Sequence, residues 1–172
     1  MTLERDGMLD ALRREFDQVF AAPPPPEAEI RESLIVLGLG EASVALRLSE
    51  IKGLHALPPL MPLPATSPGL LGLAGFRGKI VPTYDLSALL GLGEGDRPRW
   101  MVLYGETLRG LAFADVREHL HVLPDELHEP GPQAPPWSAG ILSFRGHPCQ
   151  LLHLPHLISV ARPGRETIRK DG

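Results

Sequence analysis

Several features that would identify a particular class of protein are scarce in this chain of 172 residues. Its single cysteine, Cys149, excludes both an intramolecular disulfide and a cysteine-based zinc framework. Asp and Glu number 21 against 17 Lys and Arg, so the net charge of −4 lacks the basic footprint of a nucleic-acid-binding protein. No long apolar run lies near the N-terminus. We therefore expect neither a signal peptide nor direct insertion into a membrane, and a cytoplasmic protein.

Motifs for enzymatic chemistry are also missing. The sequence contains no G-x-S-x-G nucleophile elbow, and its closely spaced glycines never lead into the Gly-Lys-Ser/Thr of a phosphate-binding loop. Cys149 lies within an apolar stretch, where a small buried hydrophobic residue is expected rather than a nucleophile. We predict no catalytic residues and a protein that is not an enzyme.

Seven histidines raise the question of a metal site. His119 and His121 are two apart in an expected strand, so their side chains point the same way, and His153 and His156 could share one face of a helix. Zinc sites need three or four converging ligands, and neither pair has an obvious third. We expect no metal and no cofactor. A small metal-dependent enzyme that uses the histidines is a less favoured alternative, and a ligand-binding sensor is another.

Proline and glycine, by contrast, are plentiful, at 19 and 18 residues, which predicts frequent turns and few long helices. Residues 1–29 differ from the rest. Apolar residues recur there at spacings of three and four, which predicts an amphipathic helix, and they are Leu9, Leu12, Phe16, Val19 and Phe20. Four consecutive prolines, 23–26, then predict a stiff, extended linker. The helix would pack back on the domain or dock on a partner, and the domain itself would span 30–172.

Short strands dominate from residue 34 onward, and their pattern occurs twice. A strand pair with a turn at Gly40-Glu41 is matched by residues 100–116, with a turn at Gly105-Glu106. The stretch FRGKIVPTYDLSALL at 76–90 is matched by FRGHPCQLLHLPHLI at 144–158. Such a repeat predicts two copies of one β-unit, and we expect two small barrels of antiparallel strands, from about 34–98 and 99–160, followed by a C-terminal tail. Asp85 should cap a short helix.

Each FRG motif places an arginine in an apolar stretch. Gly78 and Gly146 would allow the chain to turn with positive φ, and an arginine before such a turn can keep its charge in water. That explanation requires no function. Arg77, however, stands in a segment almost free of charge, and arginine on an apolar surface is favoured at protein interfaces. Both interpretations stay open on the residues alone.

The same residues carry a resemblance to a known family. The stretch PGLLGLAGFRGKIVPTYDLSALLG at 68–91 resembles the central signature of CheW-like domains, the fold of bacterial chemotaxis coupling proteins, with the matching residues Pro68, Gly72, Arg77, Gly78, Pro82, Asp85, Leu86 and Gly91. The strand pair that ends at Glu50-Ile51, the segment GLAFADV with Asp115, and the closing GILSFRGHPCQLLHLPHLI are similar to further family motifs. The resemblance covers residues 34–160.

This resemblance implies a mainly β fold of two SH3-like five-stranded barrels with a hydrophobic core between them. It implies a non-enzymatic adaptor or scaffold in a chemosensory two-component pathway that controls motility. Its expected partners are the cytoplasmic tip of a methyl-accepting chemoreceptor and the regulatory domain of a CheA-type histidine kinase, so the protein would be recruited to receptor arrays. By the same resemblance, we expect Arg77 and Glu50 to contact the partners. Gly78, Pro82, Asp85 and Asp115 take structural roles, and Arg145 keeps the structural interpretation.

The chain departs from the family pattern near these contacts. Gly75-Phe76 stand where the family has Asn-Leu, Ala114 replaces a valine, and the stretch between Asp115 and Gly140 is short and rich in proline. A diverged member that binds only one of the two partners is therefore the main alternative.

Overall fold

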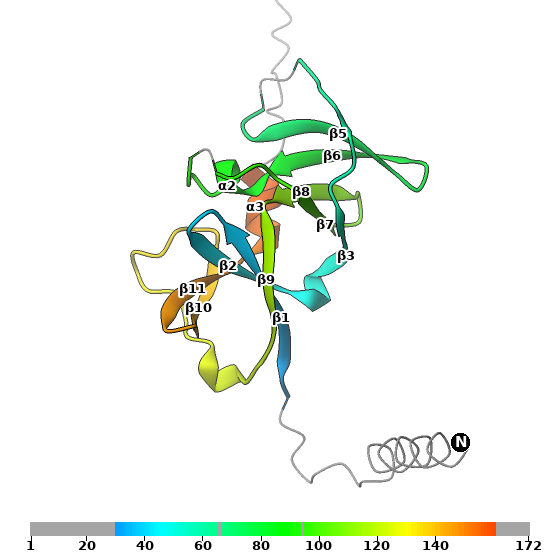
Figure 1. Cartoon of the computed structure of the whole chain (residues 1–172). Helices are drawn as coiled ribbons and strands as arrows, with labels where there is room; N and C mark the ends of the chain where they lie inside the picture. Colours follow the sequence, from blue (N-terminus) through cyan, green and yellow to red (C-terminus); the bar gives the residue numbers. More distant parts are fainter. Residues whose placement is uncertain (1–29, 65–66, 94, 161–172) are drawn as a thin grey trace, which may run out of the picture. The chain divides into compact units, whose positions relative to one another are not determined.

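Turn-rich sequence and alternating apolar residues produce two β-sheets and two short helices in the computed structural model, which describes residues 30–64, 67–93 and 95–160 (Figure 1). The expected N-terminal helix, the proline linker and the C-terminal tail lie outside the described residues. The compact unit of the domain begins at Arg31.

One sheet has the strand order β10-β11-β2-β1-β9. Its strands are β1 (Glu32–Leu39), β2 (Ala42–Arg47), β9 (Asp115–Val122), β10 (Ser138–Phe144) and β11 (His147–Leu152). The chain beyond β9 contains the short 3₁₀ helix η2 (Pro124–Glu126) and then returns to β10, where the backbone of His128 exchanges two hydrogen bonds of 2.9 Å with Ile141. This bridge links the two edges of the sheet. We call this sheet the terminal barrel, because both ends of the described chain contribute strands to it.

The other sheet has the order β3-β7-β8-β6-β5-β4. Its strands are β3 (Ile51–Ala56), β4 (Leu60–Met61), β5 (Leu70–Phe76), β6 (Lys79–Asp85), β7 (Trp100–Tyr104) and β8 (Arg109–Phe113). Its two edge strands, β3 and β4, are consecutive in the chain, so together they complete the ring. We call this sheet the central barrel. With β3 and β4 counted as one bent strand, each barrel has the five strands that the resemblance implies.

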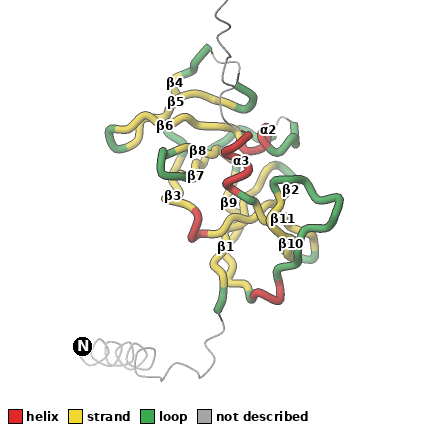
Figure 2. The backbone as a smooth tube through the Cα atoms, turned by 180° about the vertical axis from the view of Figure 1, so that it is seen from behind, coloured by secondary structure: helices red, strands yellow, loops and turns green. Residues whose placement is uncertain are grey.

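The division of the chain between the barrels corrects our expectation. We expected 34–98 to form one barrel and 99–160 the other. Instead, the hairpin β1–β2 of the first half joins the FRG strands β10 and β11 of the second half, while β7–β8 joins β5 and β6 (Figures 1 and 2). The chain crosses between barrels at the 3₁₀ helix η1 (Leu48–Glu50), and again at Ala114.

This exchange also makes the sheets mixed rather than purely antiparallel. The contacts β2 with β11 and β6 with β8 are parallel, and all other strand pairs are antiparallel. The repeat could not reveal the exchange, because two similar hairpins have the same hydrophobic pattern whichever pair of FRG strands they join.

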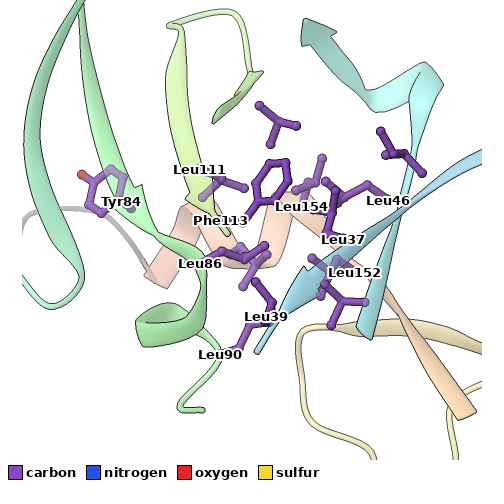
Figure 3. Packing of buried hydrophobic residues seen from close by; sticks show 14 residues of the cluster. Leu37, Leu39, Leu46, Tyr84, Leu86, Leu90, Leu111, Phe113, Leu152 and Leu154 are labelled. Carbon is purple, nitrogen blue, oxygen red and sulfur yellow. The ribbon is translucent and has the colours of Figure 1, made fainter. Parts of the chain in front are cut away.

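Three groups of buried side chains stabilise this arrangement. The smaller two fill the barrels, around Leu34 and Leu151 in the terminal barrel and around Val81 and Met101 in the central one. The largest lies between the barrels and centres on Phe113 (Figure 3). Helices α2 (Leu86–Leu89) and α3 (Leu154–Val160) contribute Leu86 and Leu154 to it. The barrels therefore share one hydrophobic interface, which burial of apolar area stabilises.

Candidate partner-binding site

Both FRG motifs form the same tight hairpin turn. In the central barrel Phe76 pairs with Lys79, and the two residues between them have positive φ, 47° at Arg77 and 76° at Gly78. Positive φ at both central positions defines a type I′ turn, which matches the twist of the strands. The glycine was expected to adopt this conformation. The arginine was not expected to adopt it, because a left-handed backbone conformation is strained for residues other than Gly, Asn and Asp.

The terminal barrel repeats this turn with one difference. Arg145 has φ 51° and Gly146 has φ 79°, and each arginine lies over the ring of the preceding phenylalanine, with Cζ 5.2 Å from the Phe76 centroid and 5.0 Å from the Phe144 centroid. Arg145 also donates a hydrogen bond of 3.1 Å to the Glu118 carboxylate. In the part of the chain that the structure describes, no acidic side chain pairs with Arg77.

An exposed apolar surface adjoins Arg77. The register places Met61, Leu73 and Pro82 in one row across β4, β5 and β6, and Ile80 follows two residues from Pro82 on the same face. Ile80 is 73% exposed and Met61 is 65% exposed. Gly75 stands opposite Ile80 and has no side chain to cover it. We call Met61, Leu73, Arg77, Ile80 and Pro82 the hairpin patch.

Asp85 and Pro82, two of the residues for which a structural role was expected, both lie in strand β6 of this hairpin. Asp85 ends β6 and caps α2, since its Oδ1 accepts a hydrogen bond of 3.2 Å from the backbone N–H of Ala88. Pro82 lies in β6 just before the parallel pairing with β8 begins at Thr83. A proline has no N–H to donate, and it is tolerated at a strand position that lacks this second ladder.

Glu50 lies far from this turn in the sequence, at the first crossover between the barrels. Its Oε1 is 3.8 Å from Arg47, whose Nε donates to Glu32 at 2.7 Å. The other carboxylate oxygen is buried without a hydrogen-bond partner. Burial, and then the Glu50 charge, raise the pKa of Tyr104 above its ordinary value of 10.0. The Glu50 side chain remains 29% exposed, so it faces both the barrel junction and solvent.

Asp115 occupies the matching position at the second crossover. It opens β9 directly after Ala114, and its Oδ1 is 3.7 Å from the Arg99 guanidinium, whose Nε donates to the Ala114 carbonyl at 3.2 Å. Both groups of this ion pair are largely exposed. The pair contributes at most about 1 kcal/mol, as exposed ion pairs do.

Cys149 is fully buried in the terminal barrel, where burial raises the pKa of its thiol to about 11. Across the described ranges, no group of three or more His, Cys, Asp or Glu side chains is arranged to hold a metal ion. None of the described helices is long and apolar enough to cross a membrane.

The sequence identified the FRG turns but missed the surface beside them. Ile80 and Met61 are apolar, and apolar residues in a strand are ordinarily assigned to the core. The available signal was Gly75, because a glycine opposite an apolar strand residue leaves that residue uncovered.

Comparison with known proteins agrees with this architecture. The scaffolding protein TtCheW from Thermoanaerobacter tengcongensis has a solved structure that superposes with a TM-score of 0.68 at 20% identity, over 74% of this chain and 92% of that one. None of the curated proteins compared with the chain matches it. A family model for the CheW-like domain matches residues 33–162. The chain therefore belongs to the CheW-like domain family, and its role is that of a non-enzymatic chemotaxis adaptor or scaffold.

Proposed function

We propose that this protein couples the cytoplasmic tip of a chemoreceptor to the regulatory domain of a CheA-type histidine kinase, and that the hairpin patch is one of its contact surfaces. Membership of the family supports the adaptor role. The partners follow from the family resemblance of the central motif. The protein would act in the cytoplasm, at receptor arrays.

The observation that supports the hairpin patch as a contact surface is the difference between the two FRG turns. Both arginines adopt the same strained backbone conformation, and both lie over a phenylalanine ring. Arg145 is paired with Glu118, whereas Arg77 is unpaired among the described residues. Strain in a backbone is retained where the side chain has a role that compensates for it. For Arg77 that role would be a carboxylate of a partner, which its planar fork binds through two hydrogen bonds.

The apolar part of the hairpin patch supplies the rest of the contact. Burying one large aliphatic side chain such as Ile80 contributes about 1.5–3 kcal/mol. Apolar side chains next to an arginine are a common composition of an energetically important interface region. The expected partner surface is therefore apolar with an acidic residue beside it.

Glu50 would serve a second contact at the junction of the barrels. Its position between Arg47 and Tyr104 couples any partner bound there to the crossover between the two sheets. Partners that contact different barrels could then be held in a defined relative orientation.

The experiment measures binding of the full chain to the kinase regulatory domain and to the receptor tip separately, by isothermal titration calorimetry. The variant Arg77→Glu should abolish binding to at least one of them, because it places a like charge against the partner's acidic residue. The matched control is Arg145→Glu, which reverses the charge at the equivalent turn of the other barrel and should leave binding within about threefold. Circular dichroism establishes that both variants are folded.

Each result of this binding experiment supports or contradicts a stated part of the proposal. Unchanged binding of both partners by Arg77→Glu would remove the hairpin patch from the interface. Equal losses from the two variants would show a general effect of charge. Binding of one partner alone by the wild-type chain would support the alternative of a diverged adaptor that serves a single partner.

A further inference from the structure

Two exposed histidines on β9 form a cluster that the adaptor role does not use. His119 and His121 are alternate residues of the strand, so their side chains leave the same face of the sheet. Their ring centroids are 4.5 Å apart and the rings meet edge to face at 62°. The structure thus brings together two imidazoles, the side chains that first-row transition metals bind most often.

The neighbouring strand holds one of these rings in place. Ser33 of β1 stands directly opposite His121, and its Oγ is 3.1 Å from His121 Nδ1. When Nδ1 carries the proton and donates it to this hydroxyl oxygen, Nε2 keeps a free lone pair with which it can bind a metal ion. A hydrogen bond to the non-ligating nitrogen is the usual support of a metal-bound histidine, because it fixes both the tautomer and the ring orientation.

The spacing fits one ion. Two nitrogens that bind one metal at about 2.0 Å each, at right angles, lie about 3 Å apart, a separation that rings with centroids 4.5 Å apart can reach by small side-chain rotations. No third His, Cys, Asp or Glu joins the pair among the residues that the structure describes. The adjacent Glu118 alternates to the other face and pairs with Arg145. Water would therefore fill the remaining coordination positions.

We propose that His119 and His121 form a surface site for a divalent transition-metal ion, supported by Ser33. Among these ions Cu²⁺ binds such a nitrogen pair most tightly, and Zn²⁺ and Ni²⁺ bind it more weakly, following the general order of stability. The site is a binding site and not a catalytic one, because two protein ligands do not hold a metal as firmly as the three of a catalytic zinc site.

The test uses the untagged full chain, because a histidine tag would itself bind the ion. Calorimetric titration with Cu²⁺ should give one ion per chain, and the electron paramagnetic resonance spectrum should show two imidazole nitrogens bound to copper. His119→Ala and His121→Ala should each remove this two-nitrogen signal. Ser33→Ala keeps both ligands and should weaken Cu²⁺ binding by about tenfold, the effect expected of a lost supporting hydrogen bond.

The control is the double variant His153→Ala/His156→Ala, which removes the other histidine pair of the sequence and should leave both the stoichiometry and the spectrum unchanged. The side chains of His119 and His121 are exposed, so their removal should not unfold the barrel, and circular dichroism verifies this. A wild-type chain that binds no Cu²⁺ at micromolar concentration would overturn the proposal. So would a two-nitrogen signal that survives His121→Ala or disappears in the control variant.

Discussion

Replacing Arg77 with Asn separates the structural role of the FRG turn from its role in binding. Arg77 has φ 47° and precedes Gly78 in a type I′ turn, the setting in which Asn-Gly is the preferred sequence. Asn is several-fold enriched in the left-handed region relative to other side chains, which corresponds to about 1 kcal/mol in favour of the variant. On backbone conformation alone, asparagine would be the better residue at this position.

The opposing contribution is the contact between the guanidinium and the Phe76 ring, whose centroid is 5.2 Å away. At an exposed site such a contact contributes about 0.5–1 kcal/mol. The two effects nearly cancel, so Arg77→Asn should leave the free energy of unfolding within about 0.5 kcal/mol of the wild type or raise it slightly. Arg145→Asn gains the same conformational benefit but also loses the exposed pair with Glu118, so it should be less stable than Arg77→Asn by about 0.2–1 kcal/mol.

The assay is equilibrium unfolding in urea, followed by the fluorescence of Trp100 and Trp137, together with the partner-binding titration. We expect Arg77→Asn to keep its stability and lose affinity for a partner, and Arg145→Asn to do the reverse. A destabilisation of more than about 1 kcal/mol by Arg77→Asn would refute the reasoning, because it would show that the arginine stabilises the folded chain. Full affinity in a stable Arg77→Asn variant would refute the assignment of the contact.

Two further predictions concern the barrels. Cys149 should not react with a disulfide reagent at pH 8 in the folded protein and should react at once in urea, because burial raises its pKa from 9.0 to about 11 and the thiolate is the reactive form. Rapid labelling of the native protein would contradict this burial. Since the unfolded chain loses the thiol proton at lower pH than the folded chain, the free energy of unfolding should fall as the pH rises from 9.0 to about 11. Gly72→Ala should destabilise the central barrel by about 1–3 kcal/mol in the urea assay, because Gly72 has φ 152° and a Cβ there would lie 2.4 Å from the Met61 carbonyl oxygen. Gly75→Ala is its matched control, since a Cβ there meets nothing within 4 Å, and equal effects of the two substitutions would refute the steric explanation.

The candidate site illustrates how far sequence patterns reach. The Phe-Arg-Gly repeat was sufficient to locate both turns, because a glycine between two apolar runs is a local signal. It did not distinguish Arg77 from Arg145 except through the family resemblance. That distinction depends on Glu118, which lies in β9 and pairs with Arg145 in the turn of the terminal barrel. Likewise, the spacing of His119 and His121 is visible in the sequence, whereas Ser33 becomes their neighbour only when β1 pairs with β9.

The sequence by itself determined the strands, the positions of the FRG turns, the cap of α2 by Asp85 and the family, because each of these depends on residues close together in the chain. Only the tertiary structure decided which hairpin belongs to which barrel. Each half of the chain gives its first hairpin to the barrel that contains the other half's FRG strands, so that the crossovers fall at Glu50 and Ala114. Strands with similar hydrophobic patterns do not specify their partners locally, whereas the large apolar interface around Phe113 combines side chains from both barrels and its burial stabilises the folded arrangement.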